Sequence, residues 1–320
     1  SMCKSLASGD WDPSYVEEKD YQIRASLIRS EEYLKSFMTN WLSAGRLNFP
    51  DSPNKGVFMD WTSGKTIPFK IKLKGYIVLI KQIIRLRKLK SFRLEDLSDS
   101  QDGSYGFYFP KSLLDLAISL PNILLGRSIN PSRFIQITES KLRVFYYESE
   151  IRENINEEIN TVLEIGGGYG GLASQILENN DVSKYYIVDL HDALPLAYCY
   201  LKKKYPHYKI QCLSDPDIEI KDDANIILIP PWRADEIAGE VDISISTMSM
   251  QHQTESSVTF YLKKFDNLKS KFIFQVERDS KRDPSDIAIS DYPFPDSYKK
   301  FVWKKYLFDD HILAIHKREG

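Results

Sequence analysis

Five glycines within six positions, 166–168 and 170–171, separate two segments of opposite character. Residues 161–165 form an apolar run broken by one acid, as in a buried strand, and residues after the glycines follow helical periodicity. Glycine permits positive φ and lets a backbone approach its neighbours without a Cβ in the way. A strand, a tight glycine turn and a helix in this order open a βαβ unit. The sequence therefore predicts a parallel sheet covered by helices.

The segment from 151 to 320 continues this alternation of short apolar runs and helical stretches. We predict strands at 161–165, 185–189, 225–230, 242–247 and 271–276, and helices at 171–179, 193–205 and 256–268. The run 208–213 is half polar and has no helix after it, so we favour 225–230 as the third central strand. Two further runs, 300–306 and 311–316, flank a short turn and predict a hairpin. The expected fold is an α/β, Rossmann-like sheet of seven strands, mostly parallel and ending in an antiparallel hairpin.

The first 150 residues have a different texture. Apolar residues recur at helical spacing over 15–42, 74–97, 112–125 and 131–154. We expect a mainly helical region over 1–150, which shapes an acceptor site or mediates oligomer contacts, and an α/β domain over 151–320. Between 61 and 94 there is no acid but there are ten basic residues, so segment 65–93 is a candidate contact for a membrane surface or a phosphorylated sugar. A solvated helix face balanced by acidic neighbours is the alternative.

Composition narrows the class of protein. The net charge of −2 provides no global field that would recruit nucleic acid. Three scattered cysteines, Cys3, Cys199 and Cys212, argue for a reducing compartment and against a structural zinc site. No apolar run reaches the roughly 18–20 residues needed to span a bilayer, and the first residues lack a signal-peptide pattern. We therefore expect a cytoplasmic protein with no nucleic-acid partner.

The glycine turn is a candidate cofactor site. The helix that follows it offers unpaired N–H groups to an anionic group. Asp189, at the end of the second predicted strand, can accept both hydroxyls of a ribose. The same spacing also fits the dinucleotide fingerprint, so an NAD-dependent oxidoreductase is an alternative. Glu164 distinguishes an oxidoreductase from a methyltransferase. Dinucleotide-binding folds keep an apolar residue at this position, whereas S-adenosylmethionine methyltransferases have the pattern acid-x-Gly-x-Gly-x-Gly.

Four segments carry a family resemblance. Residues 163–173, 187–190, 229–232 and 246–251 read LEIGGGYGGLA, IVDL, IPPW and STMSMQ. In these four segments, the chain from about residue 143 onward resembles the sugar O-methyltransferase family associated with bacterial surface polysaccharide genes. The resemblance implies a class I fold that uses S-adenosyl-L-methionine, releases S-adenosyl-L-homocysteine and methylates a sugar, a nucleotide sugar or a glycan. By position it implies a cofactor site formed by Glu164, Gly166, Gly167, Gly168, Tyr169, Gly170, Asp189, Pro230, Trp232 and Thr247.

The segment after the fourth predicted strand holds the candidate catalytic group. The family pattern there is Ser-Phe-Gln-Glu-Met, and this chain has Ser-Met-Gln-His-Gln over 249–253, so His252 replaces the glutamate. An imidazole beside the cofactor crevice is suited to removing a hydroxyl proton, which predicts His252 as general base. A surface histidine that caps the next helix is the other interpretation. The departure also leaves open a binding protein that keeps the fold without turnover.

Residues around this segment are candidate contacts for the substrate. We select Gln251 beside the histidine, Arg278 after the fifth strand and the aromatic Tyr292. Four nearby acids have spacing that matches no metal motif, so we expect no metal. They are Asp279, Asp283, Asp286 and Asp291.

Overall fold

The computed structural model describes residues 86, 107–110, 114–115, 134–137, 139–190, 193–213, 217–281, 286–307 and 310–319. The described residues before Asn156 belong to one compact unit, and those from Asn156 onward belong to another.

The unit before Asn156 contains a small sheet and a helix. Strands β1 (Phe107–Pro110) and β2 (Phe134–Ile137) pair antiparallel, and helix α6 (Glu139–Asn154) follows. The predicted helix over 131–154 is therefore wrong at its start. The reason is local, because Phe-Ile-Gln-Ile in β2 favours extended backbone and finds a partner strand. Leu86 and residues 114 and 115 are helical. The rest of the helices predicted over 15–42, 74–97 and 112–125, and the rest of basic segment 65–93, lie outside the described residues.

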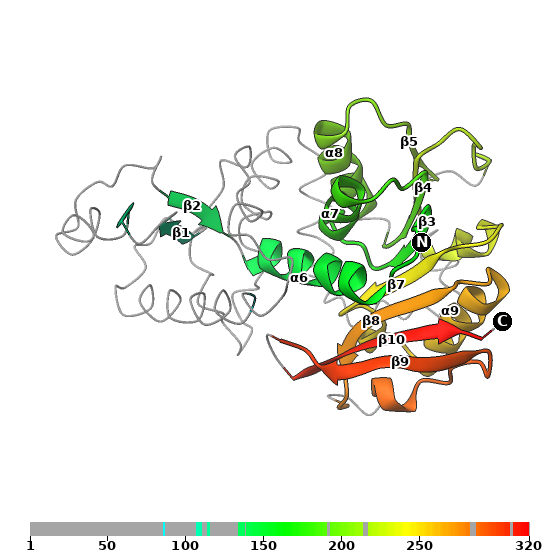
Figure 1. Ribbon diagram of the computed structural model, residues 1–320. Helices are drawn as coiled ribbons and strands as arrows, with labels where there is room; N and C mark the ends of the chain where they lie inside the picture. The colour runs from blue at the N-terminus through cyan, green and yellow to red at the C-terminus, as the bar shows by residue number, and fades with distance from the viewer. Residues whose placement is uncertain are drawn as a thin grey trace, which may run out of the picture. The chain divides into compact units, whose positions relative to one another are not determined.

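The unit from Asn156 onward is built on one sheet of eight strands (Figure 1). They are β3 (Thr161–Ile165), β4 (Lys184–Val188), β5 (Ile210–Cys212), β6 (Ile226–Ile229), β7 (Ile243–Thr247), β8 (Phe272–Arg278), β9 (Tyr298–Lys305) and β10 (His311–Arg318). The strand order is β5-β6-β4-β3-β7-β8-β10-β9. The first six strands in this order pair parallel, and β10 pairs antiparallel with both β8 and β9. The predicted parallel sheet that ends in an antiparallel hairpin is confirmed.

One strand more than the predicted seven is present. Segment 208–213 contributes β5, which pairs parallel with β6 at the edge of the sheet. All three β5 residues are half-buried, whereas every residue of β6 is buried. An edge strand has one neighbour and exposed positions, so its composition stays half polar and its apolar pattern is weak.

Within the described part of this unit, three helices and three short 3₁₀ turns connect the strands. The helices are α7 (Gly171–Asn179), α8 (Leu194–Lys204) and α9 (Glu255–Asn267), close to their predicted bounds. The turns are η4 (Pro231–Glu236), η5 (Met250–His252) and η6 (Ile289–Asp291). Thr254 caps α9, since its side chain accepts a hydrogen bond from the Ser257 N–H, so His252 is not the cap of that helix.

Side chains of β3 alternate between the two faces of the sheet. Leu163 and Ile165 are fully buried and belong to one core cluster with Tyr261 and Phe265 of α9. Glu164 lies between them and therefore faces the opposite side. This alternation puts a carboxylate inside the domain one residue before the strand ends.

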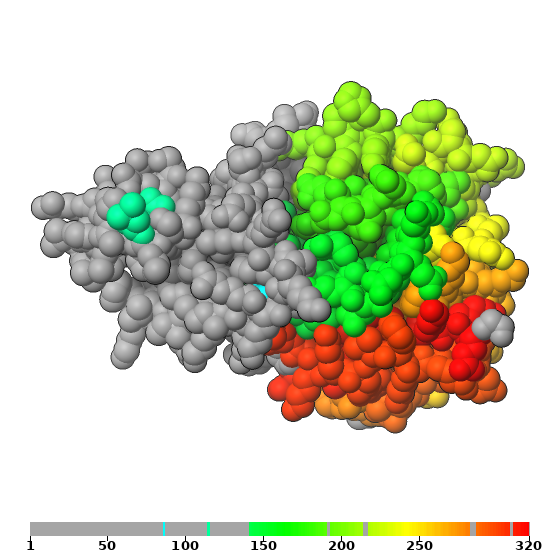
Figure 2. All heavy atoms as spheres, viewed as in Figure 1, coloured from blue at the N-terminus to red at the C-terminus, as the bar shows by residue number. Residues whose placement is uncertain are grey.

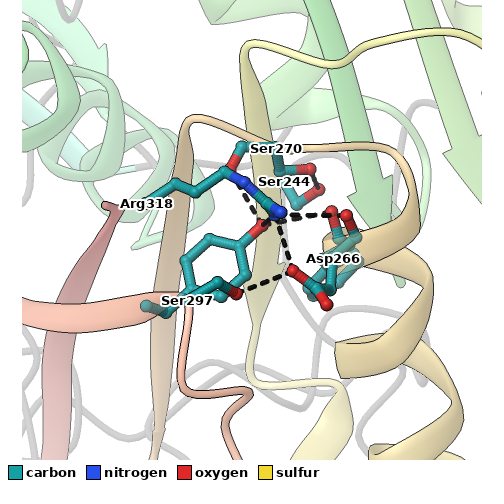
Figure 3. Close-up of polar contacts among 7 residues, drawn as sticks. Ser244, Asp266, Ser270, Ser297 and Arg318 are labelled. Atoms are coloured by element: carbon teal, nitrogen blue, oxygen red, sulfur yellow. Dashed lines mark hydrogen bonds and ion pairs between the residues drawn. The ribbon is translucent and has the colours of Figure 1, made fainter. Parts of the chain in front are cut away.

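A polar network connects the β9–β10 hairpin to α9 at the end of the sheet where strands β7 and β8 begin (Figure 3). Arg318 and Ser297 both donate to Asp266 Oδ1, at 2.6 and 2.7 Å. Beside them, the Ser244 and Ser270 hydroxyls lie 2.6 Å apart. In the space-filling view, the orange and red residues of the hairpin lie along one side of this unit, and yellow-green residues lie along the opposite side (Figure 2). The network therefore holds the hairpin in place from the end of the sheet opposite the glycine turn.

Candidate functional site

The strand order reverses at the carboxyl ends of β3 and β7, where open α/β sheets have their ligand crevice. From β3 the chain moves to β4 and β6 on one side, then returns to β7 and β8 on the other side. Ligands of open α/β sheets bind outside the carboxyl ends of the strands where the order reverses in this way. The glycine turn after β3 and the segment 248–253 after β7 meet at this point.

The glycine turn has a conformation and a packing that require glycine. Gly166, Gly168 and Gly170 have φ of 78°, 57° and 86°. A Cβ at position 166 would overlap the Ser249 side chain, and one at position 167 would lie 2.6 Å from Ile187 Cγ2. The glycines therefore allow the turn to pack tightly against Ser249 of the segment after β7 and against Ile187 of β4.

Glu164 is a buried carboxyl beneath this turn. It is 2% exposed, and the Tyr185 hydroxyl of β4 donates to its Oε2 at 2.8 Å. A Cβ on Gly167 would lie 3.2 Å from the same oxygen. Burial raises the pKa of Glu164 to about 7, the Tyr185 hydrogen bond opposes the rise, and the charge of Asp189 adds to it. A cation at the turn would stabilise this carboxylate.

Because its pKa is raised on folding, Glu164 makes the free energy of unfolding depend on pH. The unfolded chain releases the proton near the ordinary pKa of 4.5, and the folded chain releases it near about 7. The folded state thus binds more protons in between, and stability falls as pH rises through that window. We expect Glu164→Gln to gain stability relative to wild type between pH 5 and 8, by as much as about 3 kcal/mol. Urea unfolding at both pH values tests this, and an unchanged difference would contradict the burial of an ionisable group.

Asp189 follows β4 and faces the same turn. It is 8% exposed, and its Oδ2 accepts a hydrogen bond from the Gly168 N–H at 2.6 Å. The Leu190 N–H donates to Oδ1 at 2.7 Å. These two backbone N–H groups orient the Asp189 carboxylate at the glycine turn.

The predicted residues after β6 lie at the adjacent carboxyl end. Pro230 is buried and precedes η4, and Trp232 is 45% exposed. Arg233 fixes this turn, since it pairs with Glu236 and donates to the Ile218 carbonyl at 2.6 Å. The Trp232 ring is thus presented on the surface by a turn that is itself anchored.

Tyr169 and Thr247 complete the predicted cofactor set. The Tyr169 ring packs edge-on against Tyr200 of α8, with centroids 5.1 Å apart. Thr247 is the half-buried last residue of β7. Tyr169 therefore supports the turn from the α8 side, whereas Thr247 lies at the carboxyl end of the central strands.

The segment after β7 is held by a second buried carboxyl. Met248 has φ of 56°, an uncommon value outside glycine, and begins a tight turn. Glu277 of β8 is fully buried, and its Oε1 accepts from the Ser246 hydroxyl at 2.6 Å. Backbone N–H groups of the segment also donate to it: Ser249 at 3.3, Met250 at 3.2 and Gln251 at 3.1 Å. Glu277 thereby fixes the backbone that carries His252.

Gln251, His252 and Arg278, predicted separately, lie together. The Arg278 N–H donates to Gln251 Oε1 at 2.9 Å, and its guanidinium donates to the Gln251 carbonyl at 2.9 Å. His252 is half-buried, with Nε2 3.2 Å from Gln251 Nε2 and Nδ1 3.5 Å from Arg278 Nη2. Asp286 pairs with Arg278 at 3.2 Å. The structure thus forms a polar cluster where acceptor chemistry was predicted.

Tyr292, a predicted substrate contact, is buried. It is 5% exposed and its hydroxyl, among the described residues, has no hydrogen-bond partner. Burial raises its pKa, and the charge of Glu277 contributes to the rise. Tyr292 packs in the core beside the site rather than on an open surface.

The sequence reasoning missed the two supports of the site. Tyr185 begins the predicted strand 185–189, and Glu277 directly follows the predicted strand 271–276. A signal existed for Glu277, because this acid follows the mostly apolar run Phe272–Val276, much as Glu164 interrupts β3. Acids inside buried strands are rare and point to a structural or functional role.

Two absences concern the described residues only. Within that part of the chain, no group of three or more His, Cys, Asp or Glu side chains is placed to hold a metal ion. In the same part, no helix combines the length and the apolar character needed to cross a membrane.

Comparisons with known proteins gave similarities among solved structures at low sequence identity. No family model and no curated protein matches the sequence. Among solved structures, magnesium protoporphyrin IX methyltransferase from Synechocystis PCC 6803, with bound SAM, is 11% identical, with 55% of this chain and 78% of that chain covered at a TM-score of 0.42. A ribosomal protein L11 methylase from Lactobacillus delbrueckii subsp. bulgaricus is 11% identical, covering 56% and 80% at 0.38. The methyltransferase domain of a bacterial Hen1 is 12% identical, covering 56% and 97% at 0.40.

The strand order defines the fold class. Six parallel strands with a reversal at β3 and β7, and an antiparallel β10 between β8 and β9, form the Rossmann-like sheet that the sequence predicts. The sugar O-methyltransferase resemblance remains a prediction from the sequence.

Proposed function

We propose that this chain is an S-adenosylmethionine-dependent O-methyltransferase that acts on a sugar hydroxyl. The observation that carries the cofactor assignment is the pair of carboxyls at the glycine turn, Glu164 and Asp189, beside the N-terminus of α7. A methionine end carries an ammonium and a carboxylate. Glu164 suits the first, and the N–H groups at the start of α7 suit the second.

The same charges disfavour the NAD alternative. A dinucleotide brings its pyrophosphate to the glycine turn, where Glu164 lies directly beneath Gly167. The two negative phosphates would be repelled by the carboxylates of Glu164 and Asp189. This repulsion is strong because the dielectric constant inside a protein is low. A sulfonium and an ammonium are instead attracted by both carboxylates.

When bound, S-adenosylmethionine supplies a methyl group made electrophilic by the sulfonium. Asp189 would accept the ribose hydroxyls, and Pro230 and Trp232 would border the adenine. Gly166 lets the Ser249 side chain pack directly against the turn. His252 would receive the proton of the acceptor hydroxyl as the oxygen–methyl bond forms.

The acceptor class rests on the sequence resemblance and on the polar cluster of Gln251, His252 and Arg278. Hydroxyl-rich sugars are recognised by amide, guanidinium and imidazole groups of this kind. The proposed acceptor is a nucleotide sugar or a growing bacterial surface polysaccharide. In this proposal, residues 1–150 shape the binding site of the acceptor. The reaction takes place in the cytoplasm.

Transfer of labelled methyl to a panel of nucleotide sugars and glycans tests the proposal. We expect one of them to be methylated, and His252→Ala to lower kcat about 100-fold or more, as loss of a general base does. His207→Ala, at an exposed histidine, is the matched control and should leave kcat unchanged. Binding of S-adenosylhomocysteine without transfer to any acceptor would favour a non-catalytic binding protein. Less than a tenfold loss in His252→Ala would rule out that residue as the base.

A further inference from the structure

The orientation of the Gln251 side-chain amide is fixed by its surroundings. The side chain is 5% exposed, and the oxygen Oε1 lies 2.9 Å from the Arg278 backbone nitrogen. A backbone N–H can only donate, so the amide oxygen must face Arg278. The reversed amide would set two donors against each other in a buried place. The amide nitrogen therefore points the other way, toward His252.

This orientation determines which nitrogen of His252 carries a proton. Gln251 Nε2 lies 3.2 Å from His252 Nε2, and an amide nitrogen offers only donors. His252 Nε2 must then accept, which requires that it carry no hydrogen. A neutral imidazole holds its single proton on the other nitrogen, Nδ1.

Arg278 does not reverse this assignment. Its Nη2 lies 3.5 Å from His252 Nδ1, at the limit of hydrogen-bond length, and the guanidinium is already engaged by the Gln251 carbonyl at 2.9 Å and by Asp286 at 3.2 Å. The shorter contact with Gln251 therefore decides the tautomer.

We infer that Gln251 is a positioning residue that holds His252 in the tautomer with Nε2 unprotonated, so that this lone pair receives the proton of the acceptor hydroxyl. The inference rests on the proposed function for its chemical meaning. The acceptor hydroxyl replaces the amide N–H at Nε2. Its proton passes to Nε2 while the oxygen–methyl bond forms and the sulfur–methyl bond breaks, leaving a neutral thioether and an imidazolium.

The tautomer can be measured without cofactor or acceptor. In the full chain labelled with ¹⁵N-histidine, a long-range proton–nitrogen correlation spectrum distinguishes protonated from unprotonated ring nitrogens. The chain has five histidines, and the signals lost in His252→Asn assign this one. At about pH 8, where unperturbed imidazoles are neutral, we expect an unprotonated Nε2 and a protonated Nδ1. A protonated Nε2 in wild type would overturn the inference.

A matched pair of variants tests the role of the amide. Gln251→Glu has the same shape and can still accept from the Arg278 N–H, but it presents an acceptor to His252, so we expect a proton on Nε2. Gln251→Met removes the donor at similar volume and should give a mixture of tautomers. An unchanged tautomer in Gln251→Glu would contradict a positioning role, even if that variant were less stable.

Activity separates this inference from the proposed function. If wild type has the expected tautomer but methylates no acceptor, the proposed function fails and the positioning of His252 stands. If it is active, Gln251→Glu should lower kcat about tenfold or more, with little change in the KM for S-adenosylmethionine. A KM effect alone would indicate a binding role and overturn positioning.

Discussion

Replacing Gly166 with alanine is expected to weaken binding of S-adenosylhomocysteine about 100-fold or more. Gly166 has φ of 78°, where an L-residue costs about 1–2 kcal/mol, and its Cβ would overlap the Ser249 side chain. The overlap forces apart the two segments that form the crevice, so the loss exceeds the cost of the backbone conformation alone. Isothermal calorimetry with wild type and variant measures it.

Gly239 provides the matched control. It has φ of 90°, and a Cβ there would meet nothing within 4 Å. Gly239→Ala should therefore lower the unfolding free energy by about 1–2 kcal/mol and leave S-adenosylhomocysteine affinity unchanged. If Gly166→Ala also bound within about threefold of wild type, the crevice would not lie at this turn.

Glu277→Ala should cause the largest loss of stability among single changes at the site. It removes the acceptor for one hydroxyl and three backbone N–H groups in a buried place. Unsatisfied buried donors are costly, and we expect the free energy of unfolding to fall by about 4 kcal/mol. Because the same segment carries His252, methyl transfer should fall with it. Urea unfolding and the transfer assay measure the two effects.

Two comparisons make this second prediction specific. Glu277→Gln keeps the shape but sets an NH₂ group among donors, so its loss should be smaller than that of alanine. Glu240→Gln alters an exposed carboxylate paired with Lys269 at 2.8 Å, and should leave stability within error of wild type. Equal stability of Glu277→Ala and wild type would show that the segment after β7 is anchored by other groups.

The parallel core could be predicted because its signal is local. β3, β4 and β6 are short, mostly apolar runs buried on both faces, and β7 alternates isoleucine with serine. The turns and helices between these strands have their own periodicity. β5 was not counted because an edge strand keeps polar residues. The prediction included β2 in a helix because β2 has only four residues and lies just before helix α6. Four residues show too little periodicity to distinguish a strand from a helix.

The parts of the site that a single sequence segment forms could be predicted. The contacts between segments that are far apart in the sequence could not. The glycine turn and Asp189 could be placed from strand ends alone, since parallel strands present their carboxyl ends at one edge. The contacts of Tyr185 with Glu164 and of Glu277 with Ser246 join residues 21 and 31 positions apart. Such pairings depend on strand register, which no local pattern in the sequence specifies.

Calorimetric titration of the full chain with S-adenosylhomocysteine and, separately, with NAD tests the central claim most directly. The carboxyls of Glu164 and Asp189 predict binding of S-adenosylhomocysteine at roughly micromolar Kd, about −8 kcal/mol, and no heat with NAD. Glu164→Gln should weaken the first titration, because it removes the partner of the ligand ammonium. Binding of NAD with no response to S-adenosylhomocysteine would contradict the methyltransferase assignment.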